Sequence, residues 1–282
     1  MSIFDGLGKF GLGDLQGTNL FEEEKKAEES SPEEKQKSSE DIEAEMLIDK
    51  KFKCPQCDKD FTSKIIRTGK AKPIGQDLDL RTTYENIDKD KYDVIMCPHC
   101  GYAALSSYFN RITPPQLKLV RENISSKFKP KEFSGAVYTY EEALERYQMA
   151  LVNALVKKSR ASEKAFICLK TSWVIRGKIS TLDPEQDKEE IAKLKVQEAE
   201  FIKNAFEGFA NARSVESYPM CGMDELTIDY IIAVLAMKNE RYDIATRLLG
   251  GIITSRTVGK RLKEKAQDLK EVLVKEKRAR EE

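Results

Sequence analysis

The sequence predicts a mainly α-helical fold in which a small β module precedes a series of antiparallel helices. Two observations predict it. Two Cys-x-x-Cys pairs, Cys54 with Cys57 and Cys97 with Cys100, lie in the first half among short apolar runs near alternation. From Pro114 onward, apolar residues instead recur at intervals of three, four and seven, which is the pattern of amphipathic helices.

Residues 1–46 are predicted to be a disordered acidic tail. The stretch from Phe21 to Glu45 consists largely of Glu, Lys and Ser, so it cannot bury enough apolar surface to offset the entropy cost of ordering. The first dozen residues differ because apolar side chains alternate with glycines there, at Ile3, Phe4, Leu7, Phe10 and Leu12. We expect a flexible terminus, and the alternative is a docking peptide on a charged tether.

Residues 47–110 predict a β module that is held together by a metal ion. Each cysteine pair has proline after its first cysteine, and apolar runs flank the pairs in the strand–knuckle–strand order of a zinc ribbon. Two residues between cysteines let a tight turn aim both sulfurs at one ion, and four thiolates favour tetrahedral zinc. We therefore expect Cys54, Cys57, Cys97 and Cys100 to bind one structural Zn²⁺ per chain, without an open position for catalysis.

A redox role is the competing interpretation of these cysteines. Thioredoxin-like sites, however, have a single pair at the start of a helix, and two pairs flanked by strands fit that pattern poorly. His99, the only histidine, occupies an x position of the second pair, and we expect it to point away from the metal because four ligands are already present. A single histidine also weakens a hydrolase interpretation, since general acid–base catalysis often uses histidine.

Residues 64–91, between the two pairs, are predicted to be a long insert loop. Its basic residues favour contact with phosphate, so a nucleic-acid-associated zinc-ribbon factor is the alternative function. Five acidic residues offset that charge, and Tyr84 and Tyr92 are the available stacking aromatics. Asp77 and Asp79 form an Asp-x-Asp pair, which is a weak signal for a metal site. The basic residues include Lys64, Arg67, Lys70, Lys72 and Arg81, and the acidic residues in the insert or beside it include Asp77, Asp79, Asp88, Asp90 and Asp93.

Residues 111–282 predict a helical domain. The first amphipathic stripe has its apolar residues at Tyr140, Ala143, Leu144, Tyr147, Ala150, Leu151, Ala154 and Leu155. Further helices are predicted over 163–178, from an N-cap at Asp183-Pro184 onward, and over 223–238, 242–254 and 258–277. The short breaks predict antiparallel hairpins that stack on one another.

Residues 230–252 resemble a tetratricopeptide (TPR) unit. Small Ala233 and Ala245 would let two helices approach closely, while Tyr242 would fill the remaining gap. The match departs at Asp229, where the repeat usually has an aromatic residue, and at Glu240, where it favours glycine. The predicted fold is therefore a small β zinc ribbon followed by a TPR-like antiparallel helical-repeat domain.

The two remaining cysteines have different contexts. Cys168 lies mid-helix among apolar residues and is predicted to be a core residue. Cys221 lies in a turn that opens a helix, and a helix N-terminus favours the thiolate form. A thiol-dependent enzyme that uses Cys221 is thus the second alternative function, although no histidine is available to activate it. We expect Cys221 instead to be a small buried residue in a tight turn.

Bulk composition excludes several classes of protein. Lys and Arg together number 48, as do Asp and Glu, so net charge provides no overall attraction to nucleic acid or to an anionic membrane. No apolar run reaches the roughly 18 residues that a membrane span needs, and the N-terminal residues lack the pattern of a signal peptide. Six cysteines without these signals indicate metal ligands in a reducing cytoplasm rather than disulfides.

The cysteine knuckles, the basic loop with Asp-x-Asp and the Tyr-x-Val run before CPHCGYAA are similar to the bacterial family catalogued as domain of unknown function 2225. Residues 169–176 resemble that family's helix bearing Ala-Trp-x-x-Arg, and residues 230–252 its terminal TPR-like hairpin. The resemblance covers roughly residues 47–275 and implies a zinc ribbon joined to a TPR-like domain in the bacterial cytoplasm, without an established activity. The chain departs from the family in its acidic tail and at residues 85–87, where the family tends to have Asn-Pro.

These observations favour a non-enzymatic adaptor over an enzyme. We expect the zinc ribbon to fix one end of the helical stack, and we expect a groove between the helices to bind a protein partner.

Overall fold

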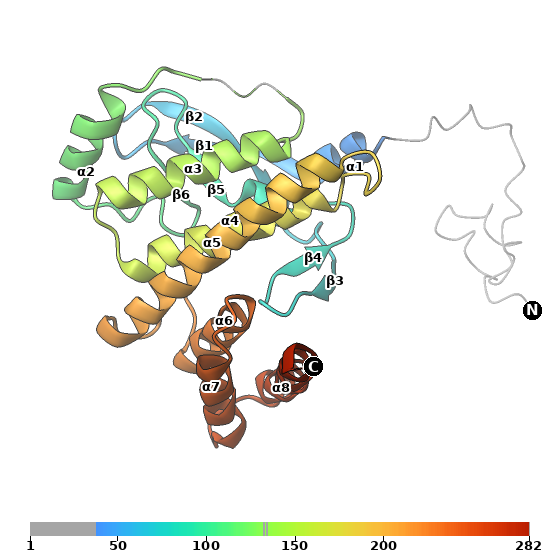
Figure 1. Ribbon diagram of the computed structural model, residues 1–282. Coiled ribbons are helices and arrows are strands. Elements are labelled where there is room, and N and C mark those ends of the chain that lie inside the picture. Colours follow the sequence, from blue (N-terminus) through green and yellow to red (C-terminus); the bar gives the residue numbers. More distant parts are fainter. Residues whose placement is uncertain (1–37, 132, 134, 282) are drawn as a thin grey trace, which may run out of the picture. The chain divides into compact units, whose positions relative to one another are not determined.

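The structure is a computed structural model that describes residues 38–131, 133 and 135–281 (Figure 1). Most of the predicted acidic tail, including its apolar first dozen residues, lies outside the described residues. The end of that tail differs from the prediction, because Ser39–Glu45 forms a short helix, α1. Ser38 and Asp41 close a capping box at its start, and the Glu43 carboxylate accepts a hydrogen bond from Tyr92 Oη at 2.7 Å. The helix cap and this long-range contact therefore stabilise a segment whose composition alone predicts disorder.

Both cysteine pairs lie at the turns of antiparallel hairpins. Strand β1 (Leu47–Lys53) pairs with β2 (Asp60–Ile66), and β5 (Val94–Met96) pairs with β6 (Ala103–Leu105). The first pair of cysteines joins β1 to β2, and the second joins β5 to β6. The predicted strand–knuckle–strand order is thus present twice.

The insert between the hairpins is not the long loop that the sequence predicts. Strand β3 (Pro73–Gln76) pairs with β4 (Thr82–Tyr84), and a 3₁₀ helix, η3 (Lys89–Tyr92), follows. These strands have four and three residues and no buried side chain, so the alternation that indicates a strand is missing from the sequence.

The rest of the described chain is helical, which confirms the mainly α fold with a strand-rich first part. Figure 1 shows α4 and α5 running side by side, with α6, α7 and α8 below them in that view. Among the described residues, none of the helices is long and apolar enough to span a membrane. The helices are α2 (Pro114–Val120) with a π-helical extension η4 (Arg121–Ser125), α3 (Tyr140–Val156), α4 (Ala161–Ile179), α5 (Lys188–Val215), α6 (Glu225–Lys238), α7 (Tyr242–Thr254) and α8 (Lys260–Glu281).

Helix α5 begins later than the Asp-Pro signal predicts. The Asp183 carboxylate accepts hydrogen bonds from the backbone N–H groups of Glu185 and Gln186, at 2.8 and 3.0 Å. Asp183 therefore closes a separate turn, and the helix begins at Lys188.

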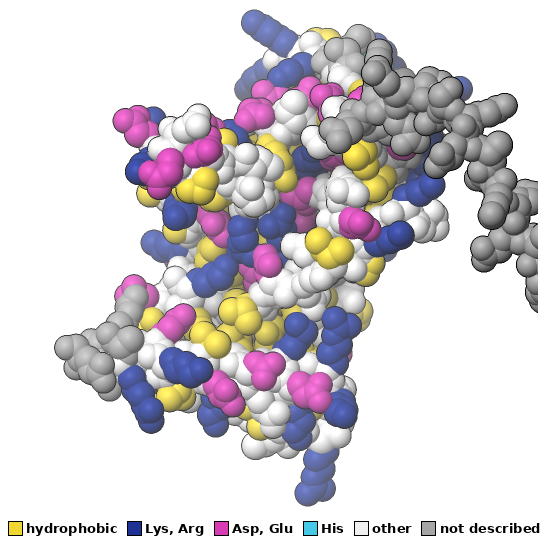
Figure 2. Space-filling view, turned by 90° about the vertical axis from the view of Figure 1, so that its right-hand side faces the viewer, with side chains coloured by type: hydrophobic (Ala, Val, Ile, Leu, Met, Phe, Trp, Pro, Cys, Tyr) yellow, Lys and Arg dark blue, Asp and Glu magenta, His cyan; other side chains and the backbone are white. Residues whose placement is uncertain are grey.

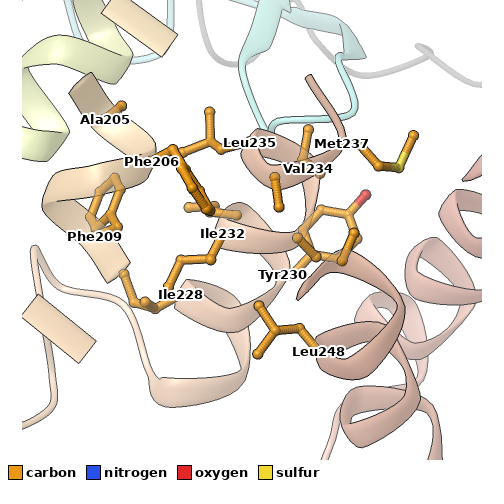
Figure 3. Close-up of a cluster of buried hydrophobic side chains, with 14 of the residues drawn as sticks. Ala205, Phe206, Phe209, Ile228, Tyr230, Ile232, Val234, Leu235, Met237 and Leu248 are labelled. Carbon is orange, nitrogen blue, oxygen red and sulfur yellow. The ribbon is translucent and has the colours of Figure 1, made fainter. Parts of the chain in front are cut away.

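The main hydrophobic core surrounds α6. Nearly every residue of α6 from Ile228 to Met237 is buried, and Figure 3 shows Phe206 and Phe209 of α5 on one side and Leu248 of α7 on the other. Ala233 and Ala245 are fully buried where α6 and α7 form an antiparallel pair. The pair has the close approach that a TPR-like unit requires, while the likeness to that repeat stays a prediction.

Both departures from the repeat pattern have local explanations. Asp229 forms two hydrogen bonds with Arg213 of α5, at 2.5 Å from Nε and 3.0 Å from Nη2. Glu240 has a φ of 59°, a left-handed backbone conformation that explains the preference for glycine at this position.

The second hairpin and the helices share one core. Side chains of β5 and β6 pack with the buried face of α3, including Ala143, Tyr147 and Ala150. The Asn153 side chain of α3 also donates a hydrogen bond to the carbonyl of Gly101 at 2.9 Å. Helix α3 therefore positions the second cysteine pair directly.

Candidate metal centre and its surroundings

The four predicted metal ligands lie together. The sulfur atoms of Cys54, Cys57, Cys97 and Cys100 are all within 4.8 Å of one another. The Cys54–Cys100 sulfur distance is 3.6 Å, and the Cys57–Cys97 distance is 3.7 Å. A tetrahedral ion with metal–sulfur bonds of about 2.3 Å would separate its sulfur ligands by about 3.8 Å. The four sulfurs therefore lie close enough together to hold one metal ion.

The two knuckles have the same backbone geometry. In each, the N–H four residues after the first cysteine donates to that cysteine's carbonyl, from Asp58 to Cys54 at 2.9 Å and from Gly101 to Cys97 at 3.1 Å. The donor residues have positive φ angles, 59° at Asp58 and 73° at Gly101. The repeated turn aims both sulfurs of each pair to the same side.

Aromatic side chains pack beside the cysteine cluster, in which Cys57 alone is half-buried rather than buried. Cys54 and Cys97 are fully buried, and the Phe52, Phe61 and Phe109 ring centroids lie 5.9 to 6.0 Å apart beside them. This apolar shell disfavours ligand exchange at the cluster, as expected for a structural site rather than a catalytic one.

Mutual hydrogen bonds set the ionisation of the clustered thiols. Bonds from Cys100 and Cys54 lower the pKa of Cys97 to about 2, whereas the bond with Cys54 raises the pKa of Cys100 well above its usual value. A negative charge on one sulfur thus opposes ionisation of its neighbours. A bound dication would remove that opposition, because metal ligation requires the thiolate form.

His99 lies outside the cysteine cluster. Its Nε2 atom is 3.3 Å from the carbonyl oxygen of Asp60 on β2. Among the described residues, the four cysteines are the one group of three or more metal-ligating side chains that lie close enough to share an ion.

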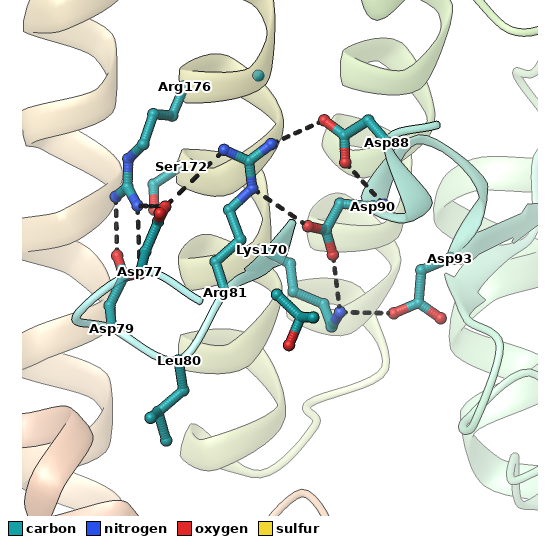
Figure 4. Close-up of polar contacts among 12 residues, drawn as sticks. Asp77, Asp79, Leu80, Arg81, Asp88, Asp90, Asp93, Lys170, Ser172 and Arg176 are labelled. Atoms are coloured by element: carbon teal, nitrogen blue, oxygen red, sulfur yellow. Dashed lines mark hydrogen bonds and ion pairs between the residues drawn. The ribbon is translucent and has the colours of Figure 1, made fainter. Parts of the chain in front are cut away.

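The Asp-x-Asp pair of the insert binds cationic side chains of the helices (Figure 4). Arg176 of α4 contacts Asp77 at 2.6 Å and Asp79 at 2.7 Å, and Lys238 of α6 contacts Asp79 at 3.3 Å. Asp79 is fully buried. Burial raises its pKa, but Arg176 and Lys238 outweigh that effect and leave the pKa below its usual value. The pair therefore acts as an ion-pair anchor, and the metal-site interpretation is not supported.

A second group of ion pairs holds the following segment against α4. Arg81 contacts Asp88 at 2.9 Å, and Lys170 contacts Asp90 at 3.2 Å and Asp93 at 2.9 Å (Figure 4). Gly177 of α4 makes room for this arrangement, because a Cβ atom there would lie only 2.8 Å from Arg81 Nη2. The mixture of acidic and basic residues in the insert was the sequence signal for these pairs.

The basic residues of the insert do not form one open surface. Lys64 is paired with Asp49 at 3.1 Å, Arg67 donates to the carbonyl of Leu47 at 2.7 Å, and Arg81 is buried in the ion-pair network. Lys70 and Lys72 are exposed. On the face drawn in Figure 2, cationic and anionic side chains are interspersed. This geometry does not favour the nucleic-acid alternative.

The two other cysteines differ in burial. Cys168 is a core residue, as predicted, and burial raises its pKa to about 11. Cys221 lies in the turn before α6 with a φ of 52°, and its thiol is 3.3 Å from the carbonyl of Ser162. Burial raises the pKa of Cys221, so its thiol is protonated near neutral pH. This is the opposite of the thiolate that a helix N-terminus would favour.

Comparison with known families settles what group the chain falls into. Residues 47–273 match the model of a family described as "Uncharacterized protein conserved in bacteria (DUF2225)". The chain belongs to this family. The DUF2225 region contains both cysteine pairs, the ion-paired insert and the helices through most of α8. No curated protein and no solved structure matches the chain.

Arg146 is a candidate functional residue that the sequence did not single out. It lies on α3 between Ala143 and Ala150, at helical spacing from both, and it is 3% exposed. The sequence signal that could have identified Arg146 is the position of this charged residue within the apolar stripe of α3.

Proposed function

We propose that this DUF2225 protein is a non-enzymatic, zinc-stabilised adaptor that binds a protein partner through its helices. The observation that carries the proposal is an apolar groove of about 460 Å³ between α3, α4 and α5. Grooves that expose apolar side chains behind a polar rim are typical of protein interaction sites.

Zinc is the metal that best suits the four-cysteine cluster. Four thiolates in a closed tetrahedral shell favour zinc over the harder cations that prefer oxygen ligands. The ion would hold the two hairpins together and, through the shared core, support α3. Its role in this proposal is structural.

The groove has an apolar floor and a mixed polar rim. Leu151 and Leu155 of α3 and Phe201 of α5 line it together with small residues of α4, and Leu155 is 56% exposed. The rim carries charges of both signs, from Lys164 and Glu200. We expect the partner to insert apolar side chains of an amphipathic segment, with little selection for its net charge.

Substitution at the groove tests the adaptor function. Leu155→Glu would place a charge where an apolar partner side chain is expected, so partner affinity should fall roughly tenfold or more. The measurement is affinity capture with the tagged full-length chain from native cells, with and without nuclease, followed by titration of each captured partner after purification.

Val196→Glu is the matched control. Val196 is 70% exposed on α5 and does not line the groove, so this variant should bind partners as the wild type does. Equal binding by the Leu155→Glu variant would refute the groove, and capture that nuclease abolishes would favour the nucleic-acid alternative instead.

A further inference from the structure

Arg146 is a buried cation with unused hydrogen-bond donors. Within the described part of the chain, neither its Nε nor its Nη1 atom has a hydrogen-bond partner, although both atoms are shielded from solvent. A buried guanidinium without a counter-ion is strongly unfavourable, because it has lost its hydration and gained no ion pair in return. We therefore expect a ligand or another interaction to offset the cost of burying this guanidinium.

Two aromatic rings compensate Arg146 only in part. The guanidinium carbon lies 3.8 Å from the ring centroid of Tyr138 and 4.3 Å from that of Phe133. Cation–π contacts of this kind involve the faces of the guanidinium and offset some of the desolvation. The N–H groups lie in the plane of the guanidinium, so stacking on its faces leaves the Nε and Nη1 donors without a hydrogen-bond partner among the described residues.

The nearest carboxylates on α3 are engaged elsewhere. Glu142 accepts a hydrogen bond from the backbone N–H of Thr139 at 2.9 Å and completes the helix cap. Glu145 forms an ion pair with Lys131. Burial lowers the pKa of Arg146 despite these two acids. Neither acid therefore neutralises the guanidinium by direct contact.

Arg146 lines a pocket of about 390 Å³ together with residues of β2 and the second knuckle. Thr62 and Ser63 also line it, with the Ser63 hydroxyl 3.3 Å from Tyr138 Oη, and Lys64 contributes a cation that is paired with Asp49 of the same pocket at 3.1 Å. The Lys64 side chain is 15% exposed, whereas its partner Asp49 is 62% exposed. The lining of the pocket thus combines the Arg146 guanidinium, whose Nε and Nη1 have no hydrogen-bond partner among the described residues, with the Lys64–Asp49 ion pair.

We propose that this pocket binds the phosphate or carboxylate group of a small molecule, with Arg146 as the principal anion ligand and Lys64 as a second cation. Both oxyanions accept paired N–H groups from a guanidinium, which supplies the hydrogen bonds that Arg146 lacks. The volume is near the lower end of the range of about 300 to 1,000 Å³ for small-molecule sites, so a small metabolite fits and a nucleic-acid strand does not.

The site does not depend on the proposed partner groove. None of the residues that line the anion pocket also lines the groove between α3, α4 and α5. Binding of a small anion would therefore persist even if no protein partner binds the groove, and the two proposals fail separately.

Titration with simple anions tests the proposal. Zinc-loaded full-length protein is titrated at constant ionic strength with inorganic phosphate and, separately, with acetate. Binding is followed by calorimetry and by the Nε–Hε resonance of Arg146 in ¹⁵N-labelled protein. We expect a saturable shift of that resonance with at least one anion, and a loss of affinity of about tenfold or more in Arg146→Met. A response to phosphate alone identifies a phosphorylated ligand, and a response to acetate alone identifies a carboxylate.

Two further variants keep the test decisive. Arg121→Met removes an exposed arginine of η4 and should leave anion binding unchanged. Lys64→Gln should weaken anion binding about threefold and leaves the buried arginine in place. This variant therefore tests the site if Arg146→Met does not fold. An Arg146 resonance that neither anion shifts, or equal losses in the Arg121 and Arg146 variants, would overturn the proposal.

Discussion

Single residues with positive φ determine how the cysteines of each knuckle are oriented. Gly101→Ala should destabilise the zinc-loaded protein by about 2–4 kcal/mol, because the left-handed backbone disfavours a side chain and the site has no space for one. A Cβ atom at this position would lie 2.5 Å from Cδ2 and 2.7 Å from Cγ of Phe128. Urea unfolding at neutral pH, monitored by far-UV circular dichroism, measures the change.

Asp58 provides the internal control for that prediction. It occupies the equivalent position of the first knuckle with a φ of 59°, and its side chain is 85% exposed. Asp58→Gly should therefore change the free energy of unfolding by no more than about 1 kcal/mol in either direction. Similar large losses in both variants would show that the Phe128 contact is not the cause.

At the residue scale, the sequence predicted the cluster of four cysteines better than it predicted buried charges. The cysteines could be assigned because their two-residue spacing is itself the geometric requirement for a shared ion. Arg146 could not, since its burial depends on rings at Tyr138 and Phe133 that lie outside the helix. The raised pKa of Cys221 could not be predicted, because the burial that raises it comes from the tertiary structure and not from its own turn.

At the scale of elements, the ion pairs of Asp79 bind the insert hairpin to α4 and α6. Asp79→Asn should cost about 2–4 kcal/mol of stability at pH 7, because Arg176 and Lys238 would lose a buried partner. The lowered pKa of Asp79 in the folded protein gives this loss a pH dependence. The stabilisation is complete above the usual carboxyl pKa of about 4, and it disappears as pH falls through the lower folded value.

Chemical denaturation of the wild type and the variant from pH 7 downward measures this dependence. Zinc loss at low pH affects both proteins, so the quantity of interest is the difference between them at each pH. Asp77→Asn is the companion variant. Asp77 is partly exposed, with 33% of its side chain accessible, so its substitution should cost less. A difference between wild type and Asp79→Asn that is independent of pH would contradict the ionic origin of the effect.

Elements with a strong apolar period were predictable, and elements held by polar contacts were not. The stripe from Tyr140 to Leu155 predicted α3 within a residue or two, because burial of that stripe is what stabilises the helix. The β3–β4 hairpin and α1 escaped prediction because their partners are charged side chains from distant parts of the chain. The start of α5 was misplaced because Asp183 caps a turn as well as it would cap a helix.

For the whole molecule, the shared core links metal binding to the stability of the helices. The division into a zinc-ribbon module over 47–110 and a helical domain over 111–282 would predict two independent unfolding transitions. Packing of β5 and β6 on α3 and α4 predicts one instead, because removal of either part exposes the buried face of the other. The metal is therefore expected to stabilise residues far from the cysteines.

Zinc removal tests this coupling. Elemental analysis should give about one zinc per chain, and Cys97→Ser should abolish stable binding. Chelation should lower the melting temperature of the helical signal by more than about 10 °C, since structural zinc contributes several kcal/mol and 1 kcal/mol corresponds to about 2–4 °C in a chain of this size. After chelation, hydrogen exchange should show α3 losing protection together with both hairpins. Cys168→Ser is the control for Cys97→Ser and should retain its zinc. A chelated protein that loses protection only at the hairpins would mean that the two modules fold independently, and a zinc-free wild type with unchanged melting would refute the structural role of the metal.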